Sequence, residues 1–214
     1  IQRKLTLLSA AERSALRSRL SLPTGRTILL SVAALNRHDK RLDYLIDEVA
    51  TLPTPRPFVL FAGQPDEDTP AVQSLARKQL GDDGYTIRTL PAAEMPELYQ
   101  ACDMFVLVSL VEAQGRVLIE AMSHGIPCLA HDSSVMRFAL GEHGVFGDFT
   151  QRGALTRMLA ERPRVGPDAA LAGHRHVYER FSWDRLRPRY VELLRRVASA
   201  NNTVSSSTGE NVLR

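Results

Sequence analysis

Residues 106–130, VLVSLVEAQGRVLIEAMSHGIPCLA, decide the fold of this chain. The apolar, β-branched run at 104–108 is typical of a buried strand. From Gln114 the apolar residues recur with the helical period, and Gly125 and Pro127 end the helix. Residues 126–130 then have the composition of another strand. This strand–helix–strand order predicts a right-handed crossover between parallel strands of a sheet covered on both faces.

Two glutamates mark this unit. Glu112 lies in the turn after the first strand, and Glu120 lies about two helical turns further along. Open α/β sheets bind ligands beyond the carboxyl ends of their strands, and Gly115 permits close backbone approach at the helix N-terminus. An ionised carboxylate accepts two hydrogen bonds, so Glu120 suits the two hydroxyls of a ribose. Alternatively, Glu112 is only a loop carboxylate and Glu120 only a solvated helix residue. The ligand site and this alternative both stay open.

Composition sets limits on the class of protein. The chain has 214 residues, 44% hydrophobic and 24% charged, which is enough for one buried core. It lacks an apolar run of ~20 residues, and its start, Ile-Gln-Arg-Lys, is neither a signal peptide nor an initiator Met, which indicates an excised piece. Cys102 and Cys128 are expected to be buried free thiols in a reducing compartment. A net charge of +3 with dispersed arginines disfavours nucleic acid as a partner.

Strands and helices alternate along the rest of the chain. Strands are predicted at 27–32, 58–62 and 85–90, and helices at 10–20, 40–49, 69–80, 95–101, 134–140, 155–159, 169–180 and 184–197. The pattern predicts a doubly wound, Rossmann-like α/β domain with a mainly parallel sheet over residues 27–198. Residues 1–26 are expected to be a lead-in with a capped helix, residues 162–167 a linker, and residues 199–214 a disordered polar tail.

Lys40 and Arg41 stand at the start of the predicted helix after the first strand. The loop at 33–39 before them faces the ligand edge of a parallel sheet. Cations are unfavourable at the N-terminus of a helix dipole. The two residues are either a solvated basic pair or a clamp for a diphosphate. The negative charge of a diphosphate would offset the unfavourable interaction of the two cations with the helix dipole.

The polar residues after the strand at 126–130 have a local explanation. Asp132 and the two serines that follow it are expected to cap the next helix, although His131 and Asp132 also lie where a ligand could touch them. His124, His131 and His143 are not spaced like zinc ligands, so no metal site is expected.

The central unit carries a resemblance to a known family. Its fixed positions are Ser109, Glu112, Gly115, Glu120, Ala121, Met122, Gly125, Ile126 and Pro127. This pattern resembles the E-x7-E signature of the retaining glycosyltransferases of family 4, and a signature with this many positions in the right structural frame is specific. The resemblance extends over residues 27–197 and covers the nucleotide-sugar half, the C-terminal half, of the two-domain fold called GT-B. The other half is not in this chain.

The resemblance implies an activity and a set of roles. It implies transfer of a sugar from a nucleotide-diphosphate sugar, with UDP or GDP as the nucleotide, to an acceptor hydroxyl with retention and without a metal or other cofactor. Lys40 and Glu112 would be catalytic, Lys40 neutralising the diphosphate and Glu112 lying beside the sugar. The donor-binding residues would be Glu120, Gly115, Gln114, Arg116, Arg41, Gly63 and Leu90.

The implied partners follow from the same resemblance. They are the nucleotide-sugar donor, an acceptor glycan or lipid-linked glycan, and the absent N-terminal domain, without which the chain is expected to be inactive. A cytoplasmic location is expected, with any peripheral association at the inner face of a membrane made through missing parts.

Two departures from the family pattern leave a second function open. The family has Gly-Arg-Leu after its first strand, where this chain has Ala33-Ala34-Leu35, so a guanidinium that neutralises the diphosphate is missing. Lys40 and Arg41 remain, and Arg37 and Arg116 are candidates to reach the phosphates instead. The first glutamate is followed by Ala113-Gln114-Gly115 in place of Gly-Phe-Gly. The alternative is therefore a non-catalytic module that binds nucleotide sugars or a partner. An NAD-type oxidoreductase is disfavoured, because Gly-x-Gly-x-x-Gly does not follow the first strand.

Overall fold

The computed structural model of the chain describes residues 1–161 and 166–207. Within these residues, one sheet of parallel strands has the order β3-β2-β1-β4-β5-β6. The strands are β1 Ile28–Val32, β2 Phe58–Ala62, β3 Tyr85–Arg88, β4 Met104–Leu107, β5 Cys128–His131 and β6 Val145–Gly147. The predicted doubly wound, Rossmann-like fold is confirmed.

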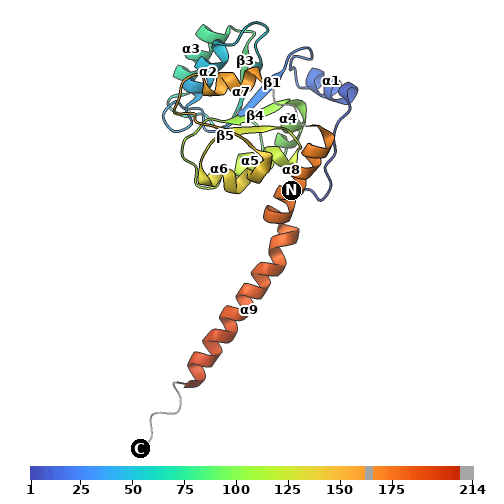
Figure 1. Cartoon of the computed structure of the whole chain (residues 1–214), viewed down its shortest axis with the longest axis vertical. Helices are drawn as coiled ribbons and strands as arrows, with labels where there is room; N and C mark the ends of the chain where they lie inside the picture. Colours follow the sequence, from blue (N-terminus) through green and yellow to red (C-terminus); the bar gives the residue numbers. More distant parts are fainter. Residues whose placement is uncertain (162–165, 208–214) are drawn as a thin grey trace, which may run out of the picture.

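Helices cover both faces of the sheet (Figure 1). On one face lie α2 Leu42–Ala50, α3 Thr69–Leu80 and α7 Ala154–Ala160. On the other face lie α1 Ala10–Arg19, α4 Met95–Ala101, α5 Arg116–Ser123, α6 Ser134–Leu140 and α8 Pro167–Phe181. A short 3-10 turn, η1 Gly141–His143, follows α6, and α9 Trp183–Ser207 projects away from the domain.

The apolar strands are continuous because both of their faces are buried. Along β1, Ile28 and Leu30 contribute to the core under α4 and α5, whereas Leu29 contributes to the core under α2 and α3. All five residues of β2 are buried. A strand with water on one face would alternate apolar with polar residues, so these runs identify an interior strand.

The strand order places a topological switch point between β1 and β4. The chain moves outward from β1 to β2 and β3, and then returns to the other side of β1 as β4. The loops that leave β1 and β4 therefore diverge at the carboxyl edge of the sheet, which is where open α/β sheets bind ligands.

Several predicted boundaries differ from the structure. Strand β6, residues Val145–Gly147, was not predicted, because it has three residues, only partly buried, and one is a glycine. The strand predicted at 85–90 ends at Arg88, and the helix predicted from Gln114 begins at Arg116. Helix α2 begins at Leu42, because Arg41 before it adopts a left-handed conformation with φ of 50°.

The first segment of the chain contains the predicted capped helix, α1, in which Ser9 and Glu12 form a capping box. The segment expected as a lead-in is tied to the domain, because Arg17 donates to the carbonyl of Ala101 and forms an ion pair of 2.7 Å with Asp103. Helix α9 continues to Ser207, past the helix end predicted at residue 197 and into the segment expected as a tail. A helix that has already formed adds one hydrogen bond per residue, which explains its extension through weak helix formers. Residues 208–214 and most of the predicted linker, 162–165, lie outside the described residues.

Helix α9 carries an apolar face that the described part of the chain leaves exposed. Its exposed apolar side chains are Trp183, Tyr190, Val191, Leu193, Leu194 and Val197. None of the described helices is long and apolar enough to cross a membrane. Cys102 and Cys128 are buried free thiols, as predicted.

Candidate functional site

An ion pair bridges the switch point of the sheet. Lys40, in the loop after β1, donates to Glu112, in the loop after β4, with a distance of 2.6 Å between Nζ and Oε1. The side chains are 25% and 17% exposed, so solvent reaches both. The structure thus brings together the two residues that the sequence predicts to be catalytic.

Asn36 shapes the loop that presents Lys40. Its side chain is almost completely buried, and its Oδ1 accepts from the backbone N–H groups of Asp39 and Lys40 at 3.1 and 2.9 Å. Its Nδ2 donates to Asp66 in the loop after β2. A short polar side chain that bonds the backbone a few residues on stabilises a tight turn. The turn holds the base of the Lys40 side chain next to the switch point.

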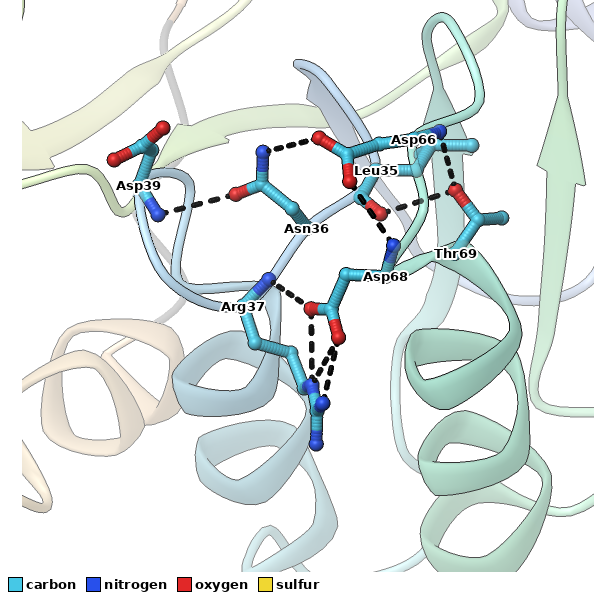
Figure 2. Close-up of polar contacts among 7 residues, drawn as sticks. All are labelled: Leu35, Asn36, Arg37, Asp39, Asp66, Asp68 and Thr69. Atoms are coloured by element: carbon cyan, nitrogen blue, oxygen red, sulfur yellow. Dashed lines mark hydrogen bonds and ion pairs between the residues drawn. The ribbon is translucent and has the colours of Figure 1, made fainter.

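The loops after β1 and β2 are joined by a polar cluster (Figure 2). Arg37 donates two parallel hydrogen bonds to the carboxylate of Asp68, and the Arg37 backbone N–H donates to it as well. The guanidinium of Arg37 lowers the pKa of Asp68 to about 2. Thr69 donates to the carbonyl of Leu35 and accepts from the N–H of Asp66. Arg37 therefore has a partner within the domain and is not directed to the switch point.

Arg41 is also occupied within the domain. Its guanidinium donates to the carbonyl of Phe149 at 2.8 Å and stacks over the Tyr44 ring at 4.6 Å. The role predicted for Arg41 in donor binding stays a prediction. In this structure the residue joins the β1 loop to the segment after β6.

Gly63 has a packing role that the sequence did not reveal. A Cβ at this position would lie 1.7 Å from the carbonyl oxygen of Ala33. The loops after β1 and β2 thus meet backbone to backbone, and only glycine fits there. The neighbour of Gly63 in this structure is Ala33, and contact of Gly63 with a nucleotide stays a prediction.

The N-terminus of α5 lies beside the Lys40–Glu112 pair. Gly115 is its N-cap residue, in a left-handed conformation with φ of 64°, and no side chain caps the helix. Gln114 and Arg116 on either side are exposed, and neither side chain has a partner in the described part of the chain. The helix dipole and a free guanidinium therefore make this end of α5 favourable for an anion.

Glu120 lies in a separate pocket of about 270 Å³. The pocket is lined by Ile1, Gln2, Lys4, Leu5, Thr6, Ala92, Met95, Pro96, Tyr99, Gln100, Glu120, Ser123 and His124. Residues 92–96 follow β3, so the pocket opens near the carboxyl edge. Glu112 does not line it, and the single crevice expected from the sequence is divided between the pocket and the ion pair. Leu90 packs against the core just before the pocket, as a loop residue would.

The remaining polar candidates have local roles. Ser133 caps α6 by accepting from the N–H of Met136, whereas Asp132 forms an ion pair with Arg137. His131 accepts from the N–H of Phe149. Within residues 1–161 and 166–199, three or more potential metal ligands do not cluster. The expectation that the reaction needs no metal stays a prediction.

Comparison with known proteins gives the family. The model of the family described as Glycosyl transferases group 1 matches residues 12–161. The chain belongs to this family.

Two relatives have names that give different activities. The chain is 29% identical to the D-inositol 3-phosphate glycosyltransferase of Thermobispora bispora over 90% of its own length and 49% of that protein. It is 30% identical to the mannosylfructose-phosphate synthase of Agrobacterium fabrum over 66% of its length and 33% of that protein. The chain thus spans about half or less of the length of these relatives.

Solved structures show the same fold. The sucrose-phosphate synthase of Thermosynechococcus elongatus has a TM-score of 0.75 at 22% identity, over 92% of this chain and 50% of that one. Alr3699/HepE of Anabaena in complex with UDP-glucose has a TM-score of 0.74 at 19% identity, over 88% and 54%. The resemblance that the sequence carries is therefore confirmed at the level of family and fold.

Sequence reasoning missed one residue of the candidate site. Tyr99 in α4 donates to Glu120 at 3.0 Å from inside the pocket. The sequence offered one signal, an aromatic residue with a polar tip on a helix that follows a predicted ligand loop. Such a residue usually finds a partner when it is buried.

Proposed function

We propose that the chain is the donor-binding half of a retaining glycosyltransferase that takes its sugar from a nucleotide diphosphate. The observation that carries this proposal is the Lys40–Glu112 pair at the switch point of a chain in the glycosyl transferases group 1 family. The UDP-glucose complex of a similar fold supports a nucleotide-sugar donor. The acceptor would be a glycan or lipid-linked glycan held in part by a second domain.

The proposed chemistry is electrostatic. When the sugar leaves, negative charge grows on the diphosphate, and catalysis requires positive groups already in place. Lys40 would contact the phosphates, with the N-terminus of α5 and Arg116 beside it. Glu112 would lie next to the sugar, and the Glu120 carboxylate would accept from the ribose hydroxyls. No step in this scheme requires a metal ion.

A second candidate function is a binding module that does not turn over. It is favoured by Ala34, which replaces the arginine of the family pattern, and by the partners of Arg37 and Arg41 within the domain. Arg37 and Arg41 are thus committed elsewhere. Of the cations in and beside the β1 loop, Lys40 remains to neutralise the diphosphate, together with Arg116 at the start of α5.

Lys40→Ala tests the donor site. We expect it to weaken the binding of a nucleoside diphosphate about tenfold, because its proposed partner is phosphate, and to leave the binding of the nucleoside nearly unchanged. The difference should shrink at about 0.5 M salt. Calorimetric titration with UDP, GDP and ADP and with the matching nucleosides measures both effects.

Lys78→Ala is the matched control, because Lys78 is an exposed lysine in the last turn of α3, at the opposite edge of the sheet. It should change neither constant. Equal losses for nucleotide and nucleoside in Lys40→Ala would show that Lys40 supports the fold and does not bind phosphate. In a full-length protein that binds the donor, absence of sugar transfer to a broad panel of acceptors would favour the binding module.

A further inference from the structure

Tyr99 and Glu120 join two helices on the same face of the sheet. The Tyr99 hydroxyl, from α4, donates to Oε2 of Glu120, from α5, at 3.0 Å. Both residues line the 270 Å³ pocket near the carboxyl edge. Tyr99 is only 2% exposed, whereas Glu120 is partly exposed. The buried residue thus holds one oxygen of a carboxylate that solvent and ligands can reach.

The Tyr99 ring cannot easily change position. It stacks on His124 with ring centroids 5.2 Å apart and planes 11° apart, and it packs against Phe105 with centroids 6.1 Å apart. A rotamer held by two ring contacts places the hydroxyl at one point in space. The hydrogen bond therefore sets the direction of the Glu120 carboxylate as well as stabilising it.

The hydroxyl acts only as a donor toward Glu120. Burial, with the nearby charge of Glu120 as a smaller cause, raises the pKa of Tyr99 well above its usual range. The phenol thus keeps its proton across the physiological range. Oε1 of Glu120 and the remaining lone pair of Oε2 stay available to accept hydrogen bonds from a ligand.

We propose that Tyr99 is a positioning residue that orients the Glu120 carboxylate to accept hydrogen bonds from both vicinal hydroxyls of the donor's ribose. This inference rests on the proposed function of the site. Two adjacent hydroxyls require two acceptor lone pairs in one plane, and a carboxylate free to rotate meets that requirement only part of the time. Tyr99 acts through Glu120 and does not touch the ribose.

Tyr99→Phe is the test, because it removes the hydroxyl and keeps the ring contacts with His124 and Phe105. The affinity of UDP, GDP or ADP, whichever binds best, should fall about fivefold to tenfold. The affinity of the 2′,3′-dideoxy form of that nucleotide should change by less than about twofold, because it has no hydroxyls to align. Calorimetric titration of the folded variant gives both constants.

A double variant separates positioning from general stabilisation. If Tyr99 acts through Glu120, then adding Tyr99→Phe to Glu120→Gln should cause much less further loss than it causes alone. Tyr85→Phe is the control. The hydroxyl of Tyr85, on the outer strand β3, donates to the backbone carbonyl of Gln73 in α3, so its removal should change neither affinity. Thermal unfolding confirms that each variant is folded at the temperature of the titration.

The possible results distinguish the positioning role of Tyr99 from the proposed function on which it rests. Equal losses for the ribose and dideoxy nucleotides, or no loss, would show that the bond only joins α4 to α5, and the proposed function would stand. If the wild-type chain binds none of the three nucleotides, the donor site and the role of Tyr99 both fail. A loss confined to the ribose form supports both.

Discussion

At the residue scale, His124 couples the candidate pocket to pH. Burial lowers its pKa to about 4, with a smaller contribution from the charge of His174. In the unfolded chain the pKa of a histidine is about 6.5, so between these values only the unfolded state takes up the proton. The stability that His124 contributes is complete above pH 6.5 and is lost as the pH falls toward 4.

We expect the free energy of unfolding to fall with acid more steeply in the wild type than in His124→Phe, which retains a ring against Tyr99. The difference should be on the order of 2 kcal/mol between neutral pH and pH 4. Urea unfolding at several pH values measures it. Parallel profiles for the two proteins would contradict the assignment, because the other titrating groups are common to both.

At the same scale, sequence reasoning predicted some residues of the site but not the contacts between them. Lys40 and Glu112 were identified from a motif and a helix start, but their contact was not, because 72 residues separate them. Arg41 looked equivalent to Lys40 in the sequence. Its left-handed backbone turns its side chain to Phe149, and such a conformation in a residue other than glycine has no reliable signal in one sequence.

At the element scale, helix α7 depends on a carboxylate from another helix. Its N-cap is Gly153, which has no side chain to accept from the first turn. Glu48, a buried residue of α2, accepts instead from the backbone N–H groups of Gly153 and Thr156 at 2.5 and 2.9 Å. A carboxylate at a helix N-terminus is also favoured by the helix dipole.

Glu48→Gln should destabilise the chain by about 1–3 kcal/mol, because an amide loses the charge and turns one donor toward an N–H group. Glu142→Gln, at an exposed glutamate of η1, should change stability by less than about 0.5 kcal/mol. Urea unfolding compares them. An unchanged free energy of unfolding in Glu48→Gln would mean that water accepts from the N–H groups at the start of α7 as well as the carboxylate does.

The elements themselves were largely predictable, since covered parallel strands and amphipathic helices have strong periods. The predictions that were wrong concern elements and boundaries whose local sequence signals are weak or conflicting. Strand β6 is three partly buried residues, and its pairing with β5 creates it. The end of α9 was set too early, since its polar sequence resembles a tail. Tertiary pairing and helix continuation act on scales that a short window of sequence does not contain.

At the scale of the whole molecule, the sheet and its two helical layers bury their apolar faces against each other. The apolar face of α9 is instead exposed in the described part of the chain. The exposed fractions on its apolar face range from 39% for Val191 to 65% for Leu194. The stripe follows a helical period and was therefore predictable as a helix. Its lack of cover was not, because sequence periodicity shows which face is apolar but not what lies against it.

If Lys40 binds the diphosphate of the donor as proposed, the Lys40–Glu112 pair makes donor binding an exchange of partners. Before a ligand arrives, the ammonium already has an anion at 2.6 Å, so a diphosphate must displace or share that carboxylate. Under the proposed function, Glu112 would thus compete with the ligand for the ammonium group of Lys40. The free energy gained when Lys40 contacts phosphate would be reduced by the free energy lost when the Lys40–Glu112 ion pair is weakened.

Glu112→Gln should consequently bind a free nucleoside diphosphate about twofold to fivefold more tightly than the wild type. In a full-length protein the same change should slow sugar transfer, because the proposed neighbour of the sugar is altered. Titration with the diphosphate alone, which carries no sugar, isolates the first effect. Weaker or unchanged binding would show that the pair persists beside the ligand. Tighter binding would mean that this carboxylate keeps the leaving diphosphate from holding the site after transfer, and so favours release of the spent nucleotide.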